Sequence, residues 1–124
     1  MRRAAAGSIA VLLALAGCAA SSEDDVAAVA AAFEASSGDP DERCDLLAPA
    51  TRAALEDEPC AEALADVPLP GGQVTEVEIW GSDARVRVGR DVVFLTETDE
   101  GWRVTAAACQ PRGERPYDCE VEGP

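Results

Sequence analysis

The cysteines of this chain have the widest range of chemistry, because a thiol can hold a metal, attack as a nucleophile or form a disulfide. Five are present among the 124 residues, at positions 18, 44, 60, 109 and 119. Histidine is absent, which removes the usual base for a serine or cysteine nucleophile and the commonest metal ligand. Lysine is absent too, since all ten basic residues are arginine. The sequence therefore predicts structural or attachment roles for the cysteines, with no metal and no cofactor.

Four of the cysteines fall into two pairs along the chain: Cys44 with Cys60, and Cys109 with Cys119. An even number of cysteines in an exported chain predicts a disulfide framework. Three pairings are open, and we favour the local one, Cys44–Cys60 with Cys109–Cys119, because each bridge then stays within one structural unit. Zinc sites usually bring cysteines in close pairs, whereas 15 and 9 residues separate these. Zinc is the less favoured alternative.

The first 17 residues have the pattern of an export signal. Arg2 and Arg3 precede an apolar stretch at 4–16, which is shorter than the ~20 residues that a membrane-spanning helix needs. The stretch ends in Leu15-Ala16-Gly17-Cys18, which resembles the lipobox of bacterial lipoproteins. That resemblance implies cleavage before Cys18 and a diacylglyceryl group on its thiol. The alternatives are a plain secretory signal or a short membrane anchor.

These signals divide the chain into a lipoprotein signal peptide (1–17), a lipidated Cys18 with a spacer (18–22), and one domain (23–124). The predicted location is the extracytoplasmic face of the cell membrane, with the lipid on Cys18 as anchor. The formal net charge of −14 argues against a nucleic-acid partner, because phosphates require a basic surface. A membrane-anchored domain with no nucleic-acid role is therefore expected.

The first part of the domain has a helical pattern. Ser21 and Ser22, followed by three acids, predict a helix start, and Val26, Val29, Ala30 and Phe33 form one apolar stripe. Shorter helices are expected over 40–47 and after Pro49 and Pro59.

From Val74 onward the period becomes two, which predicts strands at 74–80, 84–88, 92–96 and 102–108. A two-residue turn at Gly81-Ser82 places Glu78 opposite Arg85 and Glu76 opposite Arg87. The same register places Ile79 opposite Ala84 and Val77 opposite Val86. Charged and apolar pairs then separate onto two faces, which supports this register.

Three-residue turns at 89–91 and 99–101 complete the predicted sheet, and they place Glu97 opposite Arg103 and Phe94 opposite Ala106. The predicted core face holds Val77, Ile79, Val86, Val88, Val92, Phe94, Trp102, Val104 and Ala106. The opposite face holds an unexpected apolar group: Trp80, Val93, Leu95, Ala107 and Cys109. Two explanations are open: the tail 111–122 folds back over this group, or Trp80, Val93 and Leu95 form a dimer or partner interface.

Helices followed by an antiparallel sheet that contains Gly101-Trp102-Arg103-Val104 resemble the nuclear transport factor 2-like (cystatin-like) superfamily. The lipobox, Cys44-Asp45-Leu46-Leu47 and Pro116-Tyr117-Asp118-Cys119 resemble small lipoproteins of high-GC Gram-positive bacteria. The first resemblance implies an α+β fold with short N-terminal helices on a curved four-stranded antiparallel sheet. It also implies a cone between helices and sheet, and we expect Phe33, Leu47, Phe94 and Trp102 to line any pocket there.

No catalytic residue is predicted. The predicted core face has no acid or tyrosine, and the acidic clusters at 23–25, 39–42 and 56–58 are typical of a solvated surface. A non-enzymatic protein-interaction module is therefore the preferred hypothesis, with a homodimer or another envelope protein as partner. The alternative is a carrier or sensor that holds a lipid or small apolar ligand in the cone.

Overall fold

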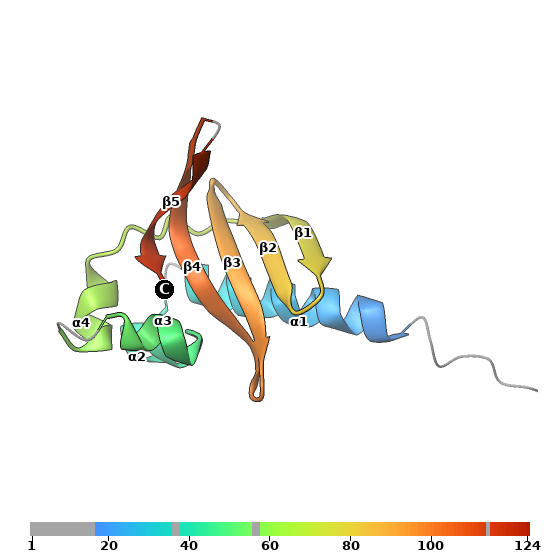
Figure 1. Ribbon diagram of the computed structural model, residues 1–124, viewed down its shortest axis with the longest axis horizontal. Coiled ribbons are helices and arrows are strands. Elements are labelled where there is room, and N and C mark those ends of the chain that lie inside the picture. Colours follow the sequence, from blue (N-terminus) through green and yellow to red (C-terminus); the bar gives the residue numbers. More distant parts are fainter. Residues whose placement is uncertain (1–16, 36–37, 56–57, 114) are drawn as a thin grey trace, which may run out of the picture.

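The computed structural model describes residues 17–35, 38–55, 58–113 and 115–124. In this part of the chain, four helices precede five strands (Figure 1). The helices are α1 (Gly17–Glu34), α2 (Pro40–Asp45), α3 (Pro49–Ala53) and α4 (Cys60–Ala65). The strands are β1 (Val74–Trp80), β2 (Asp83–Val88), β3 (Asp91–Thr98), β4 (Gly101–Arg112) and β5 (Arg115–Glu122). The fold is α+β with the helices ahead of the sheet, as the sequence predicts.

The sheet is open and antiparallel, with the strand order β1-β2-β3-β4-β5, and it has one strand more than the four predicted. The predicted tail is the fifth strand: it pairs alongside β4 instead of folding back over a face of the sheet. The physical reason is that β4 is long, and its edge would otherwise present unpaired backbone groups. The pairing of β5 satisfies those groups.

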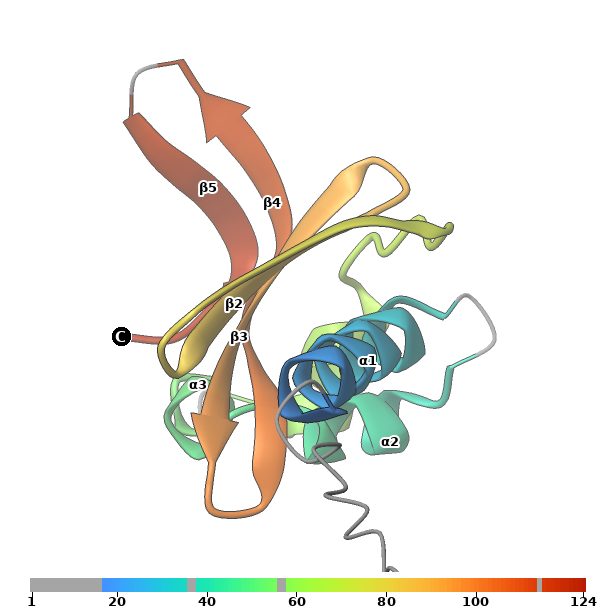
Figure 2. The ribbon, with the colours of Figure 1, turned by 90° about the vertical axis from the view of Figure 1, so that its right-hand side faces the viewer.

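Helix α1 lies across one face of the sheet, which we call the inner face; the opposite face is the outer face (Figure 2). The described part of the helix already includes Gly17, ahead of the predicted start at Ser21 and Ser22. Val26, Ala30 and Phe33 are fully buried. The predicted apolar stripe is therefore the side of α1 that packs on the sheet.

The connection between α2 and α3 joins the sheet. Helix α2 begins after Asp39, whose Oδ1 accepts a hydrogen bond from the Asp41 N–H at 2.9 Å. After the helix, the Ala48 N–H donates to the Val104 carbonyl and the Val104 N–H donates to the Leu46 carbonyl, both at 2.8 Å. Segment 46–48 thereby covers the part of the β4 edge that β5 does not reach.

The β1–β2 hairpin has the predicted register. Glu78 lies opposite Arg85, Glu76 opposite Arg87, and Val77 and Ile79 opposite Val86 and Ala84. The two charged pairs form ion pairs with N–O distances of 2.9 and 3.7 Å. Cross-strand charge pairing is thus a correct guide to this hairpin.

The predicted register of β3 is wrong by one residue. Val88 pairs with Asp91, so the turn has two residues, Gly89 and Arg90, instead of three. Gly89 has a φ of +55°, which suits the tight turns that match strand twist. Because side chains alternate between faces, this shift places Val93 and Leu95 on the inner face, and Val92 and Phe94 on the outer face. The prediction had these four side chains reversed.

The β3–β4 turn is also shorter than predicted, since Thr98 pairs with Gly101. Trp102 rather than Arg103 therefore lies opposite Glu97. A register shift between Phe94 and Leu95 then restores the predicted pairing of Phe94 with Ala106. Trp102 and Val104 face inward, as predicted. The bulge turns Ala106, which was predicted on the core face, to the outer face.

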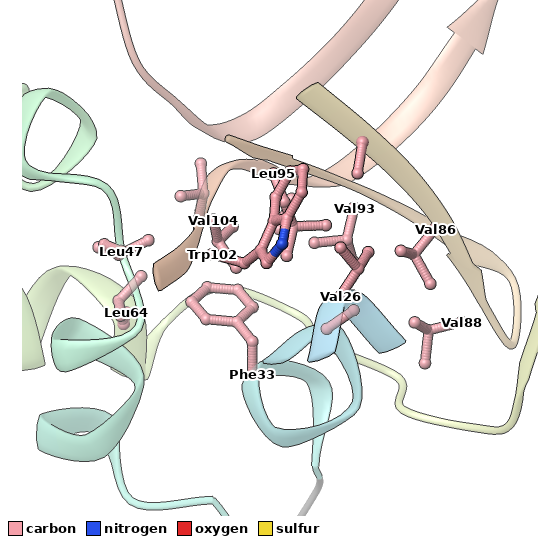
Figure 3. Packing of buried hydrophobic residues seen from close by; sticks show 14 of the residues in the cluster. Val26, Phe33, Leu47, Leu64, Val86, Val88, Val93, Leu95, Trp102 and Val104 are labelled. Carbon is pink, nitrogen blue, oxygen red and sulfur yellow. The ribbon is translucent and has the colours of Figure 1, made fainter. Parts of the chain in front are cut away.

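The main core fills the space between α1, the short helices and the inner face. Figure 3 shows side chains of α1 and of the sheet pointing toward one another. Its members include Val26, Phe33, Leu47, Leu64, Val86, Val88, Val93, Leu95, Trp102 and Val104. A smaller cluster on the outer face contains Val92, Ala106 and Cys109, with Phe94, Tyr117 and Cys119 beside them. None of the helices in the described ranges is long and apolar enough to span a membrane.

We expect Gly89→Ala to destabilise the fold by about 2–3 kcal/mol. An alanine at position 89 would have to keep the left-handed backbone conformation, and its Cβ would clash with the Gly71 carbonyl oxygen. Gly81→Ala is the matched control, because its φ is +61° but no atom lies within 4 Å of the added carbon. The control should lose only about 1 kcal/mol. Urea unfolding of the oxidised full chain measures both, and equal losses would contradict the close approach of Gly89 to Gly71.

Candidate functional site

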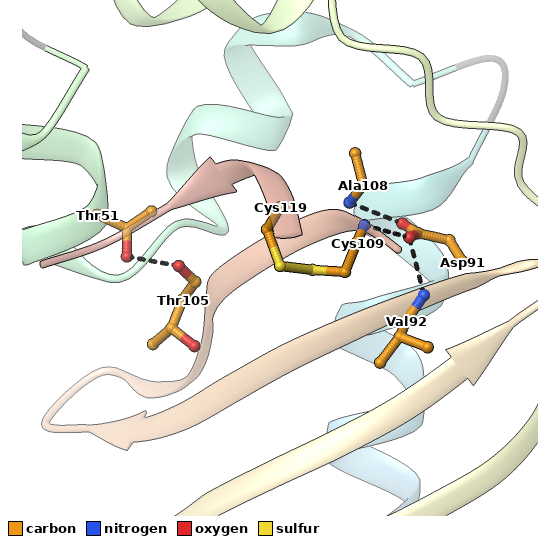
Figure 4. Close-up of a disulfide and its surroundings, with 7 residues drawn as sticks. All are labelled: Thr51, Asp91, Val92, Thr105, Ala108, Cys109 and Cys119. Carbon is orange, nitrogen blue, oxygen red and sulfur yellow. Dashed lines mark hydrogen bonds between the residues drawn. A yellow bond between two sulfur atoms is a disulfide. The ribbon is translucent and has the colours of Figure 1, made fainter. Parts of the chain in front are cut away.

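Both predicted disulfides are present. Cys44–Cys60 joins α2 to α4, with the two Cα atoms 6.1 Å apart. Cys109–Cys119 joins β4 to β5, with a Cα separation of 4.0 Å (Figure 4). Within the described ranges, no group of three or more histidine, cysteine, aspartate or glutamate residues is placed to hold a metal ion. These four thiols are therefore structural and are not available to a ligand.

The predicted lipidation site lies at the limit of the described chain. Leu15 and Ala16 fall outside it, as does nearly all of the predicted signal peptide (1–17). Gly17 and Cys18 belong to the first turn of α1, but the side chain of Cys18 is outside the described part. The predicted spacer 18–22 is helical. Lipidation of Cys18 stays a prediction.

The predicted pocket residues do not come together around a cavity. Phe33, Leu47 and Trp102 meet in the main core, where they are 0, 4 and 7% exposed. Phe94 lies on the outer face because β3 has the shifted register. The space expected to be a cone is thus packed with side chains at these positions.

The predicted interface is wrong at two of its three residues. Val93 and Leu95 are 0 and 1% exposed, because the two-residue turn before β3 directs them into the main core. Trp80 is 50% exposed at the end of β1. The apolar side chains that the shift brings to the outer face are instead Val92 and Phe94.

The outer face carries a hollow of about 520 Å³, which we call the outer-face hollow. It lies between β3, β4, β5 and the start of α3. Its lining includes Ala48, Ala50, Thr51, Phe94, Thr96, Thr105, Ala106, Pro116, Tyr117, Cys119, Glu122, Gly123 and Pro124. Glu122 has the one charged side chain among these lining residues. The hollow is therefore largely apolar, with one acidic side chain.

Two contacts fix the walls of the outer-face hollow. The rings of Phe94 and Tyr117 meet edge to face, with centroids 5.3 Å apart and planes at 66°. The Thr51 hydroxyl donates a hydrogen bond to the Thr105 carbonyl at 3.1 Å, which ties α3 to β4 (Figure 4). The Cys109–Cys119 bridge holds β5 in place beside them. The hollow is thus built from side chains with defined positions.

A buried carboxylate, Asp91, organises the other end of the same strands. Its Oδ1 accepts hydrogen bonds from the Val92 and Cys109 N–H groups at 2.8 Å, and its Oδ2 accepts one from Ala108 at 2.9 Å (Figure 4). Ala108 has a φ of +54°, so β4 is bent where it meets Asp91. Asp91 is 4% exposed, and the backbone donors replace the water that it loses.

Glu34 is the second buried acid near this point, at the end of α1. It is 0% exposed, and neither carboxyl oxygen has a hydrogen-bond partner within ordinary distance. Its pKa is raised from 4.5 to about 9, chiefly by burial and to a lesser extent by the neighbouring carboxyl group of Asp91. The backbone of Gly71 and the charge of Arg43 act in the opposite direction. Glu34 is therefore neutral at pH 7.

Arg43 supports the end of α1 beside Glu34. It is 9% exposed, its Nε donates to the Phe33 carbonyl at 2.9 Å, and a terminal guanidinium nitrogen donates to the Ala35 carbonyl. These bonds satisfy carbonyls that the end of a helix leaves unpaired. Because Glu34 is wholly enclosed, we assign the acid pair a structural role.

Neither buried acid is predicted from the sequence, although one feature of the sequence points to Glu34. Glu34 follows Val26 and Ala30 at intervals of four, so it continues the buried stripe of α1. An acid on that stripe predicts either a buried carboxyl group or the end of the helix. Glu34 is both buried and the last residue of α1. No comparable signal marks Asp91, because its burial depends on the short turn before β3.

Comparison with known proteins finds no match: no family model, curated protein or solved structure is significantly similar to this chain. The site must therefore be interpreted from its own geometry.

We expect Glu34→Gln to stabilise the protein at neutral and alkaline pH, by about 5 kcal/mol at pH 8. The folded chain keeps the Glu34 proton up to a pH of about 9, whereas the unfolded chain releases it near 4.5. The unfolded state therefore binds fewer protons in this window, and the stability of the native chain falls as pH rises through it. The amide of glutamine cannot ionise and avoids this loss.

Urea unfolding of both proteins between pH 4 and pH 9 measures this difference. The two stabilities should converge near pH 4, where Glu34 is protonated in both states. Curves that stay parallel over the whole range would contradict a neutral, buried Glu34.

Proposed function

We propose that this chain is an exported lipoprotein, anchored through Cys18, that acts as a non-catalytic interaction module on the extracytoplasmic face of the membrane. The lipobox-like sequence supports the anchor. The two disulfides support an oxidising compartment, because such bridges persist outside the cytoplasm. The helices on one face of an antiparallel sheet support our finer proposal of a nuclear transport factor 2-like fold.

The observation that carries the interaction role is the outer-face hollow. Two aromatic rings, Phe94 and Tyr117, stand beside apolar walls and the carboxylate of Glu122. This combination suits a cation on an apolar stem, because ring faces and a carboxylate attract the charge while the walls contact the stem. The proposed occupant is an arginine or lysine side chain of an envelope protein.

The charge of the whole chain supports the same partner. The formal net charge is −14, and removal of a signal peptide with Arg2 and Arg3 would make the domain more acidic still. A strongly negative domain attracts basic partners over long distances and repels acidic ones. The carrier alternative has less support, because Phe33, Leu47 and Trp102 pack into the core instead of lining a cone.

Replacement of Cys18 by serine tests the anchor. We expect Cys18→Ser to abolish fatty-acid labelling and to release the chain from the membrane fraction of a lipoprotein-processing bacterium, since the thiol is the proposed acylation site. Both disulfides should form as before, which non-reducing mass analysis checks. A serine variant that stays membrane-bound would contradict lipid anchoring through this residue.

Variants of the outer-face hollow test the interaction role in the full chain, purified in detergent. The probe is a short peptide with one arginine between leucines, and its comparison is the same peptide with neutral, isosteric citrulline. We expect Glu122→Gln to lower the affinity for the arginine peptide at least tenfold and to leave the affinity for the citrulline peptide unchanged. Phe94→Ala should lower the affinity for both peptides, because it removes part of the apolar wall of the outer-face hollow.

Glu120→Gln is the matched control, since Glu120 is an exposed acid on the same strand but does not line the outer-face hollow. Isothermal calorimetry at two salt concentrations measures all affinities. Equal effects of Glu122→Gln and Glu120→Gln would show that binding depends on overall charge and would overturn the proposed site.

A further inference from the structure

The sheet has two edge strands, β1 and β5, and in the described part of the chain no strand lies beyond either of them. β5 contains Pro116, a residue type that interrupts strand pairing, whereas β1 contains no proline. Trp80 pairs with Asp83 across a two-residue turn, so these two residues exchange both of their backbone hydrogen bonds. Because hydrogen-bonded pairs alternate along an antiparallel strand, the backbone of Glu78 also bonds to β2. The backbone N–H and C=O groups of Val77 and Ile79 point to the free edge of β1.

The side chains of β1 differ on the two faces of the sheet. Toward the outer face lie Glu76 and Glu78, whose carboxylates are about half exposed, and Trp80, which is 50% exposed. Their ion-pair partners, Arg87 and Arg85, are one strand further in. A strand added at the edge would therefore have acids directly opposite it at about 5 Å, with the arginines about twice as far away.

The inner side of β1 is apolar. Val77 and Ile79 are partly buried and pack against the main core, beside α1. Apolar side chains on an added strand would cover their remaining exposed surface. The edge thus selects a strand with basic residues on one face and apolar residues on the other.

We propose that the β1 edge binds an extended segment of a partner protein in which arginine or lysine alternates with apolar residues. The segment adds to the sheet as a sixth strand: its basic side chains contact Glu76, Glu78 and the ring of Trp80, and its apolar side chains cover Val77 and Ile79. This site is separate from the outer-face hollow, which lies over β3, β4 and β5. The two proposals therefore stand or fall independently.

Charge distinguishes this occupant from a second copy of the chain. Two β1 strands paired about a two-fold axis would place outer-face residues of one copy opposite outer-face residues of the other. In such registers Glu76 and Glu78 face each other or lie diagonally adjacent, and β1 itself offers no basic residue to compensate. Like charges across a strand pair are unfavourable, so the β1 edge disfavours self-pairing.

The test uses the full chain in detergent and a fluorescently labelled peptide of alternating arginine and valine, seven residues long. Fluorescence anisotropy gives the affinity, and the emission of exposed Trp80 should shift to shorter wavelength on binding. The Glu122→Gln variant serves as the background, so that the outer-face hollow does not compete for the arginine side chains. In this background, Glu76→Gln combined with Glu78→Gln should weaken peptide binding at least tenfold, while Glu120→Gln, at an exposed acid on β5, should leave it unchanged. Circular dichroism confirms that the double variant is folded.

Backbone methylation of the peptide provides the decisive control. The proposed strand runs antiparallel to β1. Its valines then lie opposite Val77 and Ile79 and their N–H groups bond to the edge, whereas those of the arginines point away. N-methylation of the valines should abolish binding, and N-methylation of the arginines should change it less than threefold. Equal responses to the two methylations, no binding of the unmodified peptide, or a stable dimer that excludes it would each overturn the proposal.

Discussion

The carboxylate of Asp91 is the interaction on which the most elements depend. By accepting the N–H groups of Val92, Ala108 and Cys109, it fixes the start of β3 to a bend in β4. The same bend positions Cys109 for its bridge to β5, and Asp91 adds to the effect of burial, which raises the pKa of Glu34 at the end of α1. One buried anion thereby connects a turn, a strand bend, the C-terminal strand and the main helix. Its removal would leave the backbone donors in the interior unpaired.

The sequence predicts the parts of this fold in which local chemistry distinguishes the two faces. The β1–β2 register is correct because Glu76 and Glu78 require partners, and only one register supplies Arg87 and Arg85 on the same face. The disulfide pairing is correct because each bridge stays within a single structural unit. The buried stripe of α1 is correct because its apolar residues have the helical period.

The sequence does not predict the register of a strand whose residues are apolar on both faces of the sheet. Val92, Val93, Phe94 and Leu95 are four consecutive apolar residues, so either register of β3 buries two of them. The decision rests on whether the turn before β3 has two or three residues. In the structure it has two, with Gly89 at a φ of +55°. This difference of one residue decides which side chains form the core and which form the outer-face hollow. The residue pattern alone therefore cannot locate the outer-face hollow, although Phe94 is among the residues predicted to line a pocket.

The order of the bridges along the chain has a consequence for export. Each disulfide joins a cysteine to the next one in sequence: Cys44 to Cys60, and Cys109 to Cys119. A chain that crosses the membrane with its N-terminus leading presents these thiols in that same order, and each native partner is the next to emerge. Oxidation can then keep pace with translocation and needs no later exchange of partners, which is a slow step. The proposed acylation of Cys18 would remove the one earlier thiol that competes for Cys44.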